Sequence, residues 1–466
     1  MGKKCAGCRK AKCDGCSLFT GVRVQSSKDN TEEFPPGFAW QPKKGLGIAF
    51  DIGTTTVAGA LWNLENGQRI SVESCVNPQR YVGSDVVSRM VYSRRGKLQE
   101  QEIRKMLVKA MDEIAEHLVA VSNQIKEDVR CVTVAGNTAM GEILFSINLD
   151  GLMAAPFHKG YQGCVLRQGN ELGFSFLRGA EIILLPAIEG FVGADALCVY
   201  TWVKKKDLSS NVLAVDIGTN GEMILIGEHN TYACSTAAGP ALEGAAVSQG
   251  MGAAPGAIEE IGVVGSFPRQ DIHYKTIGDA APIGICGSGL VDALAVLRRL
   301  NVIDETGYLK SKEEAAEAGV LPAVCHRLET VAGENRILLT DEYSPVYLNA
   351  GDIRQLQLAK AAIRAGIRIL LEKAGIEESQ ISRLYLAGAF GSYIRVESAL
   401  VTGLLPLLPA ERVIAVGNCA GMGAAMALLS EEVRREMEAD SNSILHVELA
   451  QEWSFQEAFL EFMGMP

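Results

Sequence analysis

The sequence predicts an α/β protein of two similar lobes, preceded by a short cysteine-rich segment. Three observations support this fold class. Apolar strands alternate with long amphipathic helices, the tetrapeptide Asp-Ile-Gly-Thr ends a strand at both 51–54 and 216–219, and four cysteines lie within the first 16 residues. Strands that alternate with helices are typical of mostly parallel sheets covered by helices. Two copies 165 residues apart indicate two related domains that face each other, because solenoid repeats are much shorter.

Length, composition and charge agree with this fold class. A chain of 466 residues, 48% hydrophobic and 21% charged, is long enough for more than one hydrophobic core. No apolar run reaches the ~18 residues of a membrane helix, and cysteines stand where a signal peptide would be apolar. The net charge is -11, and residues 1–44 alone carry +5. A small basic segment on an acidic body does not indicate a nucleic-acid partner. We therefore expect a cytoplasmic protein that binds neither membrane nor nucleic acid.

Each element has its own signal along the chain. We expect a metal-binding module at 1–20, a linker at 21–44, a first lobe at 45–206 and a second lobe at 207–466. The Ser, Pro and Gly residues of 21–44 indicate the linker. Apolar side chains at helical spacing predict long helices over 99–125 and 353–374, and small residues predict a tightly packed helix over 417–427. Apolar runs predict strands at 46–50, 57–62, 131–135, 182–185, 212–215, 381–386 and 413–416.

The repeated tetrapeptide predicts two phosphate-binding hairpins. Gly53 and Gly218 allow a tight turn and let a phosphate approach the main chain, where N–H groups and hydroxyls can donate to it. A carboxylate would repel phosphate, so we assign Asp51 to Mg²⁺ and Asp216 to the attacking water or the second face of the metal. A buried Asp that caps a turn would look the same in one copy, but two copies favour a clamp around a triphosphate. The expected donors are Thr54, Thr55, Thr56, Thr219 and Asn220.

Two glycine-containing strings, at 285–292 and 386–391, follow the hairpins in order along the chain. Together with the hairpins they resemble the superfamily of acetate and sugar kinases, heat-shock chaperone ATPases and actin. The resemblance implies two actin-like, ribonuclease-H-like lobes around a central cleft for ATP. It also assigns nucleotide contacts to a connecting motif and to an adenosine motif, which comprise Gly287, Ser288, Gly289, Gly388, Ala389, Phe390 and Gly391.

A narrower resemblance covers about residues 45–466. The strings at 76–79, 83–89, 134–140, 185–190, 235–244 and 352–357 are similar to the reductive activators of corrinoid-dependent methyltransferases. This resemblance implies that ATP hydrolysis drives the reduction of cob(II)alamin to cob(I)alamin on a partner corrinoid protein of a methyltransferase system. An iron–sulfur module, refilled by an upstream low-potential reductant, would supply the electron. Familiar members carry a larger iron–sulfur domain than the short cysteine cluster found here.

The cysteine cluster comprises the pairs Cys5-x-x-Cys8 and Cys13-x-x-Cys16, separated by four residues. Four thiolates so close together predict a metal site, because free exposed thiols would oxidise. Zinc sites made of paired cysteines usually separate the pairs by ~15–20 residues, and four cysteines suit either zinc or an iron–sulfur cluster. The family resemblance favours a 4Fe–4S cluster, with zinc as the alternative.

Glu243 and Asp85 are further candidates. Glu243 could reach the nucleotide or its water, although a place on a helix surface is an equal alternative, and we expect Asp85 to cap a helix. Two other functions stay open from the residues alone: a small-molecule kinase with a structural zinc, and a non-catalytic ATP-dependent scaffold. A homodimer is also left open.

Overall fold

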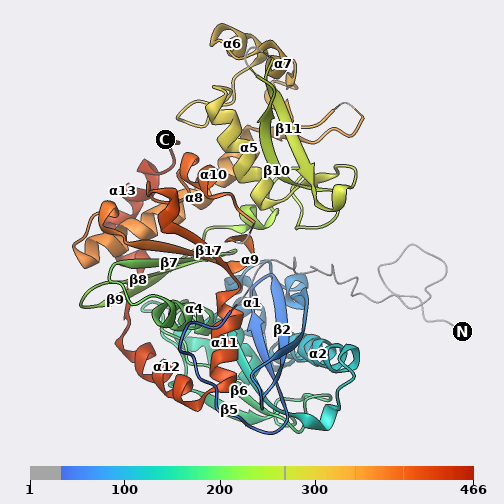
Figure 1. The fold of residues 1–466 in the computed structure, drawn as a ribbon, viewed down its shortest axis with the longest axis vertical. Coiled ribbons are helices and arrows are strands. Elements are labelled where there is room, and N and C mark those ends of the chain that lie inside the picture. The colour runs from blue at the N-terminus through green and yellow to red at the C-terminus, as the bar shows by residue number, and fades with distance from the viewer. Residues whose placement is uncertain (1–32, 267–268, 342, 392) are drawn as a thin grey trace, which may run out of the picture.

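The computed structural model describes residues 33–266, 269–341, 343–391 and 393–466. They form two lobes, each built on a six-stranded sheet, with the first lobe at the bottom of Figure 1 and the second above it. The predicted cysteine-rich module at 1–20 and the first half of the predicted linker, residues 21–32, lie outside the described residues.

The first sheet has the strand order β3-β2-β1-β4-β6-β5. Its first three strands form an antiparallel meander, β4 and β6 continue in parallel from β1, and β5 pairs antiparallel at the edge. The strands are β1 (Leu46–Ile52), β2 (Thr56–Asn63), β3 (Arg69–Val76), β4 (Val129–Gly136), β5 (Val165–Gln168) and β6 (Glu181–Leu184).

The second sheet repeats this order, as β9-β8-β7-β16-β17, with β18 added beside β9. The meander β7-β8-β9 is again antiparallel, and β16 and β17 again continue in parallel from β7. The strands are β7 (Val212–Ile217), β8 (Gly221–Ile226), β9 (Thr231–Thr236), β16 (Arg383–Ala387), β17 (Val413–Gly417) and β18 (Leu445–His446). The repeated tetrapeptide therefore marks a repeated architecture.

The expectation of mostly parallel sheets is confirmed only in part, because both sheets are mixed: two of the five strand pairs are parallel in the first sheet and three of the five in the second. In each lobe the turn after the tetrapeptide is only a few residues long, and such a short connection can join only antiparallel neighbours. The parallel pairs β1–β4 and β7–β16 instead enclose the long crossover that contains a helix.

That crossover helix is the same length in both lobes. α2 (Lys97–Val121) packs on β2 and β3, and α8 (Ala350–Ala374) packs on β8 and β9. Both confirm predicted helices, although α2 ends before 125 because Asn123 adopts a left-handed conformation. Asn349 and Asp352 form a capping box that starts α8.

Two helices lie between the sheets and join the lobes. α4 (Ala194–Lys206) packs on β4, β7 and β8, and α11 (Cys419–Leu429) packs on α4, β1 and β4. A buried apolar cluster connects side chains of both sheets through these helices. Figure 1 shows the red C-terminal helices α11 and α12 (Glu431–Ser443) within the lower lobe. The C-terminal part of the chain thus completes the first lobe.

The second lobe also contains an insertion between β9 and α8, at the top of Figure 1. It begins with the short 3₁₀ helix η4 (Pro240–Glu243) and contains two three-stranded sheets, β11-β10-β12 and β13-β14-β15. Its elements are β10 (Ala257–Val264), β11 (Asp271–Thr276), β12 (Gly284–Ile285), α5 (Gly287–Arg299), α6 (Lys312–Glu317), α7 (Pro322–Cys325), β13 (Leu328–Val331), β14 (Glu334–Leu338) and β15 (Tyr347–Asn349).

The first lobe also contains a 3₁₀ helix and two α-helices, and the second lobe contains three further α-helices. They are η1 (Pro78–Tyr81), α1 (Val86–Ser93) and α3 (Thr138–Phe145) in the first lobe, and α9 (Gly388–Gly391), α10 (Val396–Val401) and α13 (Trp453–Glu461) in the second. Phe34 and Phe38 pack against the cluster between the sheets. No helix in the described ranges is long and apolar enough to cross a membrane.

Candidate functional site

In each predicted hairpin the N–H of the glycine closes the turn, which is one residue longer in the first hairpin than in the second. In the first, the Gly53 N–H donates to the Thr56 carbonyl at 2.8 Å, which closes the turn between β1 and β2. In the second, the Gly218 N–H donates to the Asn220 carbonyl at 2.9 Å, which closes the turn between β7 and β8. Asp51 and Asp216 lie at the ends of β1 and β7, directly before these turns.

The hairpins of the two lobes meet at the carboxylate of Glu243. Thr55 Oγ1 donates to Glu243 Oε2 at 2.6 Å, and Thr219 Oγ1 donates to the same oxygen at 2.8 Å. The Thr219 N–H donates to Glu243 Oε1 at 3.0 Å, and the two threonine hydroxyls lie 3.2 Å apart. A carboxylate therefore accepts hydrogen bonds from groups of both lobes, as a phosphate oxygen would.

Acidic side chains gather beside the hairpins. Burial raises the pKa of Asp51 to about 6, and a hydrogen bond from Asn418 partly opposes this rise. Burial raises the pKa of Asp216 to about 7, and the charges of Asp51 and Asp195 add to the rise. The pKa of Asp195 and that of Glu222 are also raised, mainly by burial and then by neighbouring carboxylates. Each of the four side chains keeps some contact with solvent, so the group can be reached by a ligand.

Segments far along the chain complete this region. Asn418, just before α11, caps that helix by accepting from the Gly421 N–H at 2.7 Å. Gly388 has φ +87°, and a Cβ there would collide with Asp216 Oδ1. Only glycine fits this position, so the first residue of the predicted adenosine motif lies directly beside the second hairpin. The side chains of Ala389 and Phe390 are outside the described part of the structure.

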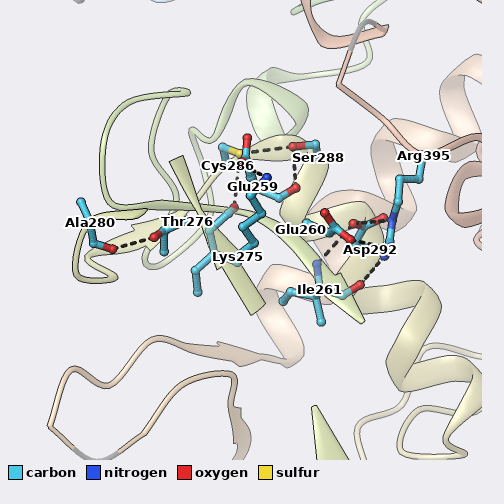
Figure 2. Close-up of polar contacts among 11 residues, drawn as sticks. Glu259, Glu260, Ile261, Lys275, Thr276, Ala280, Cys286, Ser288, Asp292 and Arg395 are labelled. Carbon is cyan, nitrogen blue, oxygen red and sulfur yellow. Dashed lines mark hydrogen bonds and ion pairs between the residues drawn. The ribbon is translucent and has the colours of Figure 1, made fainter. Parts of the chain in front are cut away.

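The predicted connecting motif begins α5, as Figure 2 shows. The Ser288 hydroxyl donates to the Glu259 carbonyl at 3.0 Å, and Cys286 Sγ donates to the Ile258 carbonyl at 3.3 Å. A Cβ at Gly289 would collide with the Ile258 carbonyl. These contacts hold the motif against β10, and α5 also packs on η4, which carries Glu243.

An ion pair joins the helix of the connecting motif to the chain just after the predicted adenosine motif. Arg395 Nε lies 2.8 Å from Asp292 Oδ2, and it joins α5 to the segment between α9 and α10 (Figure 2). Asp292 is fully buried, and burial raises its pKa although Arg395 opposes the rise. The Ile261 N–H also donates to Asp292 Oδ2, at 3.3 Å. The contact therefore holds α5 against the segment that follows α9.

Sequence reasoning missed Asp195, Glu222 and Asn418. The sequence did offer a signal for the first two, because each is an acid in an otherwise apolar element. Asp195 lies in helix α4 and Glu222 in strand β8. Such residues are rarely placed in a buried element without a function or a partner. Asn418 had no comparable signal, because helix-capping asparagines are common.

No group of three or more acidic, histidine or cysteine side chains is arranged to hold a metal ion by itself in the described ranges. Mg²⁺ commonly binds through one or two carboxylates together with water and substrate phosphates. Asp51 and Asp216 fit that mode of binding, because they lie close enough for the charge of Asp51 to raise the pKa of Asp216.

Known proteins resemble this chain over nearly all of its described length. The model of the RACo middle region matches residues 46–204, and that of the C-terminal domain of RACo, the ASKHA domain, matches residues 210–466. Corrinoid activation enzyme RamQ of Eubacterium limosum is 34% identical over 422 residues, which cover 89% of this chain and 69% of that protein.

Two further relatives are more distant. Co(II) methylated amine-specific corrinoid protein reductase of Methanosarcina barkeri is 24% identical over 405 residues, 80% of this chain and 68% of that protein. A solved structure of a reductive activator for corrinoid, iron–sulfur protein superposes with a TM-score of 0.80. It is 28% identical and covers 91% of this chain and 67% of that one.

Proposed function

Since the chain belongs to the RACo family, we propose that it is an ATP-dependent reductive activator of a corrinoid protein. Its ASKHA fold agrees with the actin-like architecture that the sequence predicts. The observation that supports ATP dependence is that the two hairpins meet at Glu243. Groups from both lobes point at one acceptor there, which is what a clamp around a triphosphate requires.

In this proposal ATP is bound between the hairpins. Phosphate oxygens take the place of the Glu243 carboxylate and accept from the hydroxyls of Thr55 and Thr219. Thr54, Thr56 and Asn220 contribute further donors from the same turns. The base and ribose lie against α5 and α9, where the predicted glycines leave room for them. α5 begins at Gly287, within the predicted connecting motif, and α9 begins at Gly388, within the predicted adenosine motif.

Mg²⁺ and water complete the chemistry of hydrolysis. Asp51 would hold Mg²⁺, which would supply positive charge to offset that of the phosphates. Asp216 orients the attacking water and accepts its proton. A pKa of about 7 suits this role, because a general base works best when its pKa lies near the working pH.

The reductive step transfers one electron. Cys5, Cys8, Cys13 and Cys16, which lie outside the described residues, would hold a 4Fe–4S cluster. Such a cluster would supply one electron for the reduction of cob(II)alamin to cob(I)alamin on the partner, and an upstream low-potential reductant would return one electron to it. ATP can drive this reduction only if it binds the open and closed arrangements of the two lobes with different affinity. In this proposal, closure of the lobes on ATP is the step that alters the partner.

An anaerobic assay tests this function. The full chain, a titanium(III) reductant and a corrinoid protein in the cob(II) state are mixed with Mg-ATP, and cob(I)alamin is followed by its absorbance. We expect cob(I)alamin with ATP and little with ADP or a non-hydrolysable analogue. Equal reduction without nucleotide, or no binding of ATP by the folded protein, would contradict the proposal.

A further inference from the structure

Arg89 is a buried cation close to the first hairpin. It lies on α1, whose N-terminus is fixed by a capping box between Asp85 and Ser88. Its side chain is only 1% exposed, which makes it one of the largest fully buried side chains of the protein. Arginine is almost never buried this completely without a paired charge or a function.

The Arg89 guanidinium contacts backbone groups and sulfur. Nη2 donates to the Thr54 carbonyl at 2.6 Å, Nε donates to the Gly83 carbonyl at 3.0 Å, and Nη1 lies 3.6 Å from Met140 Sδ. Within the described part of the chain, no carboxylate forms an ion pair with it. Burial lowers its pKa to about 10, and the more distant carboxylates of Asp85 and Glu243 oppose this change. Arg89 thus stays charged at neutral pH.

Arg89 and Asn77 together hold three consecutive carbonyls of the first turn. Asn77 Nδ2 donates to the Gly53 carbonyl at 2.9 Å, and the Asn77 N–H donates to the Thr55 carbonyl at 2.7 Å. Arg89 holds the Thr54 carbonyl between them. In a trans peptide the C=O and N–H groups point in opposite directions. Holding the carbonyls of Gly53 and Thr54 therefore directs the N–H groups of Thr54 and Thr55 away from Arg89 and Asn77.

The positive charge of Arg89 also favours the binding of phosphate at the first hairpin. Asp51, Asp216 and Glu243 bring negative charge to the region where the proposed function places a triphosphate. A buried positive charge behind the turn offsets part of that repulsion, and it acts more strongly there than it would in water.

We propose that Arg89 is a phosphate-positioning residue, which orients the donors of the first turn and supplies positive charge to bound ATP or ADP. The inference rests on the proposed function, because it requires nucleotide at the hairpins. Arg89 acts through the Thr54 carbonyl and the field of its charge. It belongs to the string at 83–89 that the family resemblance singled out and to which the site assigns no other role.

Isothermal titration of the full chain with ADP and with adenosine, both with Mg²⁺, tests this role. Adenosine carries no phosphate, so a positioning residue affects only ADP. We expect Arg89→Met to weaken ADP binding by about ten- to hundredfold, the usual effect of losing a hydrogen bond to a charged group, and to leave adenosine binding unchanged. Arg89→Lys keeps the positive charge but not the fork of N–H donors, so we expect it to lose less ADP affinity than Arg89→Met.

Arg364→Met is the matched control. Arg364 is also a buried arginine, but it lies on α8, pairs with Glu378 at 2.6 Å and stacks on Phe462. We expect this variant to lose thermal stability and to bind ADP as the wild type does.

Three results would overturn the inference. They are an unchanged ADP affinity in Arg89→Met, an equal loss for ADP and adenosine, and, where the Met variant does not fold, a wild-type ADP affinity in Arg89→Lys. Failure of the wild type itself to bind ADP would instead remove the proposed function, so the two are distinguishable.

Discussion

Asp51 and Asp216 bind protons more tightly than exposed aspartates do, because both are buried next to other carboxyl groups. Without a cation this arrangement is unfavourable, since each ionised carboxylate raises the cost of ionising the next. Bound Mg²⁺ would relieve that repulsion. The site is thus built for its ligand and not for the stability of the ligand-free chain.

Replacing Asp216 with Asn tests whether this buried carboxylate lowers the stability of the ligand-free protein. The folded chain holds the Asp216 proton up to about pH 7, whereas the unfolded chain releases it near the ordinary value of 3.8. The folded state therefore binds more protons between these values, and the free energy of unfolding falls as the pH rises from about 4 to 7. We expect Asp216→Asn to raise the thermal midpoint at pH 8 by about 2 °C or more, to have less effect at pH 5, and to abolish ATP turnover. A lower midpoint at pH 8, or unchanged turnover, would contradict the assignment.

A second prediction at the scale of single residues concerns Glu243. Its carboxylate accepts from Thr55 and Thr219, where the proposed function places phosphate, and we assign it to support Asp216 in orienting the attacking water. We expect Glu243→Gln to lower the kcat of ATP hydrolysis by about ten- to hundredfold, the usual effect of losing a hydrogen bond to a charged group, without weakening ADP binding, because Asp216 remains as the general base. The exposed Glu228, on the loop before β9, provides the control variant Glu228→Gln, whose turnover should equal that of the wild type. Weaker ADP binding in Glu243→Gln would show that Glu243 only supports the hairpin.

The sequence allowed Asp51, Asp216 and the hairpin threonines to be proposed because their signal is local: a strand, an acid, a glycine and hydroxyls in one short string. Arg89 lacks such a signal, since its importance comes from tertiary contacts with residues distant in sequence. Asp195 stands out only as an acid in an apolar helix, which does not say what it faces. For Glu243 the residues left two alternatives open, and the contacts with Thr55 and Thr219 place it at the hairpins.

At the scale of elements, the strongly periodic segments were predicted and the insertion was not. The long helices α2 and α8 show a clear apolar stripe, and the central strands are short apolar runs. The strands β11 to β15 are short and carry many exposed or half-buried side chains, so no period stands out. The mixed character of the sheets follows from turn length, which the alternation of strands and helices does not reveal.

The crossing of α4 and α11 yields a prediction about how the lobes are joined. A Cβ at Gly423 on α11 would collide with the Cys198 carbonyl on α4. We expect Gly423→Ala to destabilise the protein by about 1–3 kcal/mol through overpacking, although alanine normally favours a helix. Gly351→Ala, at the exposed start of α8, is the control and should be neutral or slightly stabilising. Equal thermal midpoints of Gly423→Ala and the wild type would show that the helices can move apart freely.

At the scale of the whole molecule, the chain combines an acidic two-lobed body with a basic N-terminal segment. Helices α4 and α11 form one apolar cluster with both sheets, so a change in lobe arrangement must pass through them. The proposed redox module lies at the other end of the predicted linker. ATP hydrolysis and electron supply are therefore expected to be separable by mutation.

Anaerobic purification with metal analysis tests this separation. We expect about four irons and four sulfides per chain, as a 4Fe–4S cluster contains, and little zinc. The double variant Cys5→Ser with Cys8→Ser should lose the iron and the formation of cob(I)alamin, yet hydrolyse ATP as the wild type does, because Asp51, Asp216 and Glu243 all lie in the described lobes. Cys75→Ser, a change at one of the scattered single cysteines, is the matched control and should keep all its iron. One zinc per chain in place of iron would leave the ATP site intact but remove the electron donor, and with it the reductive half of the proposed function.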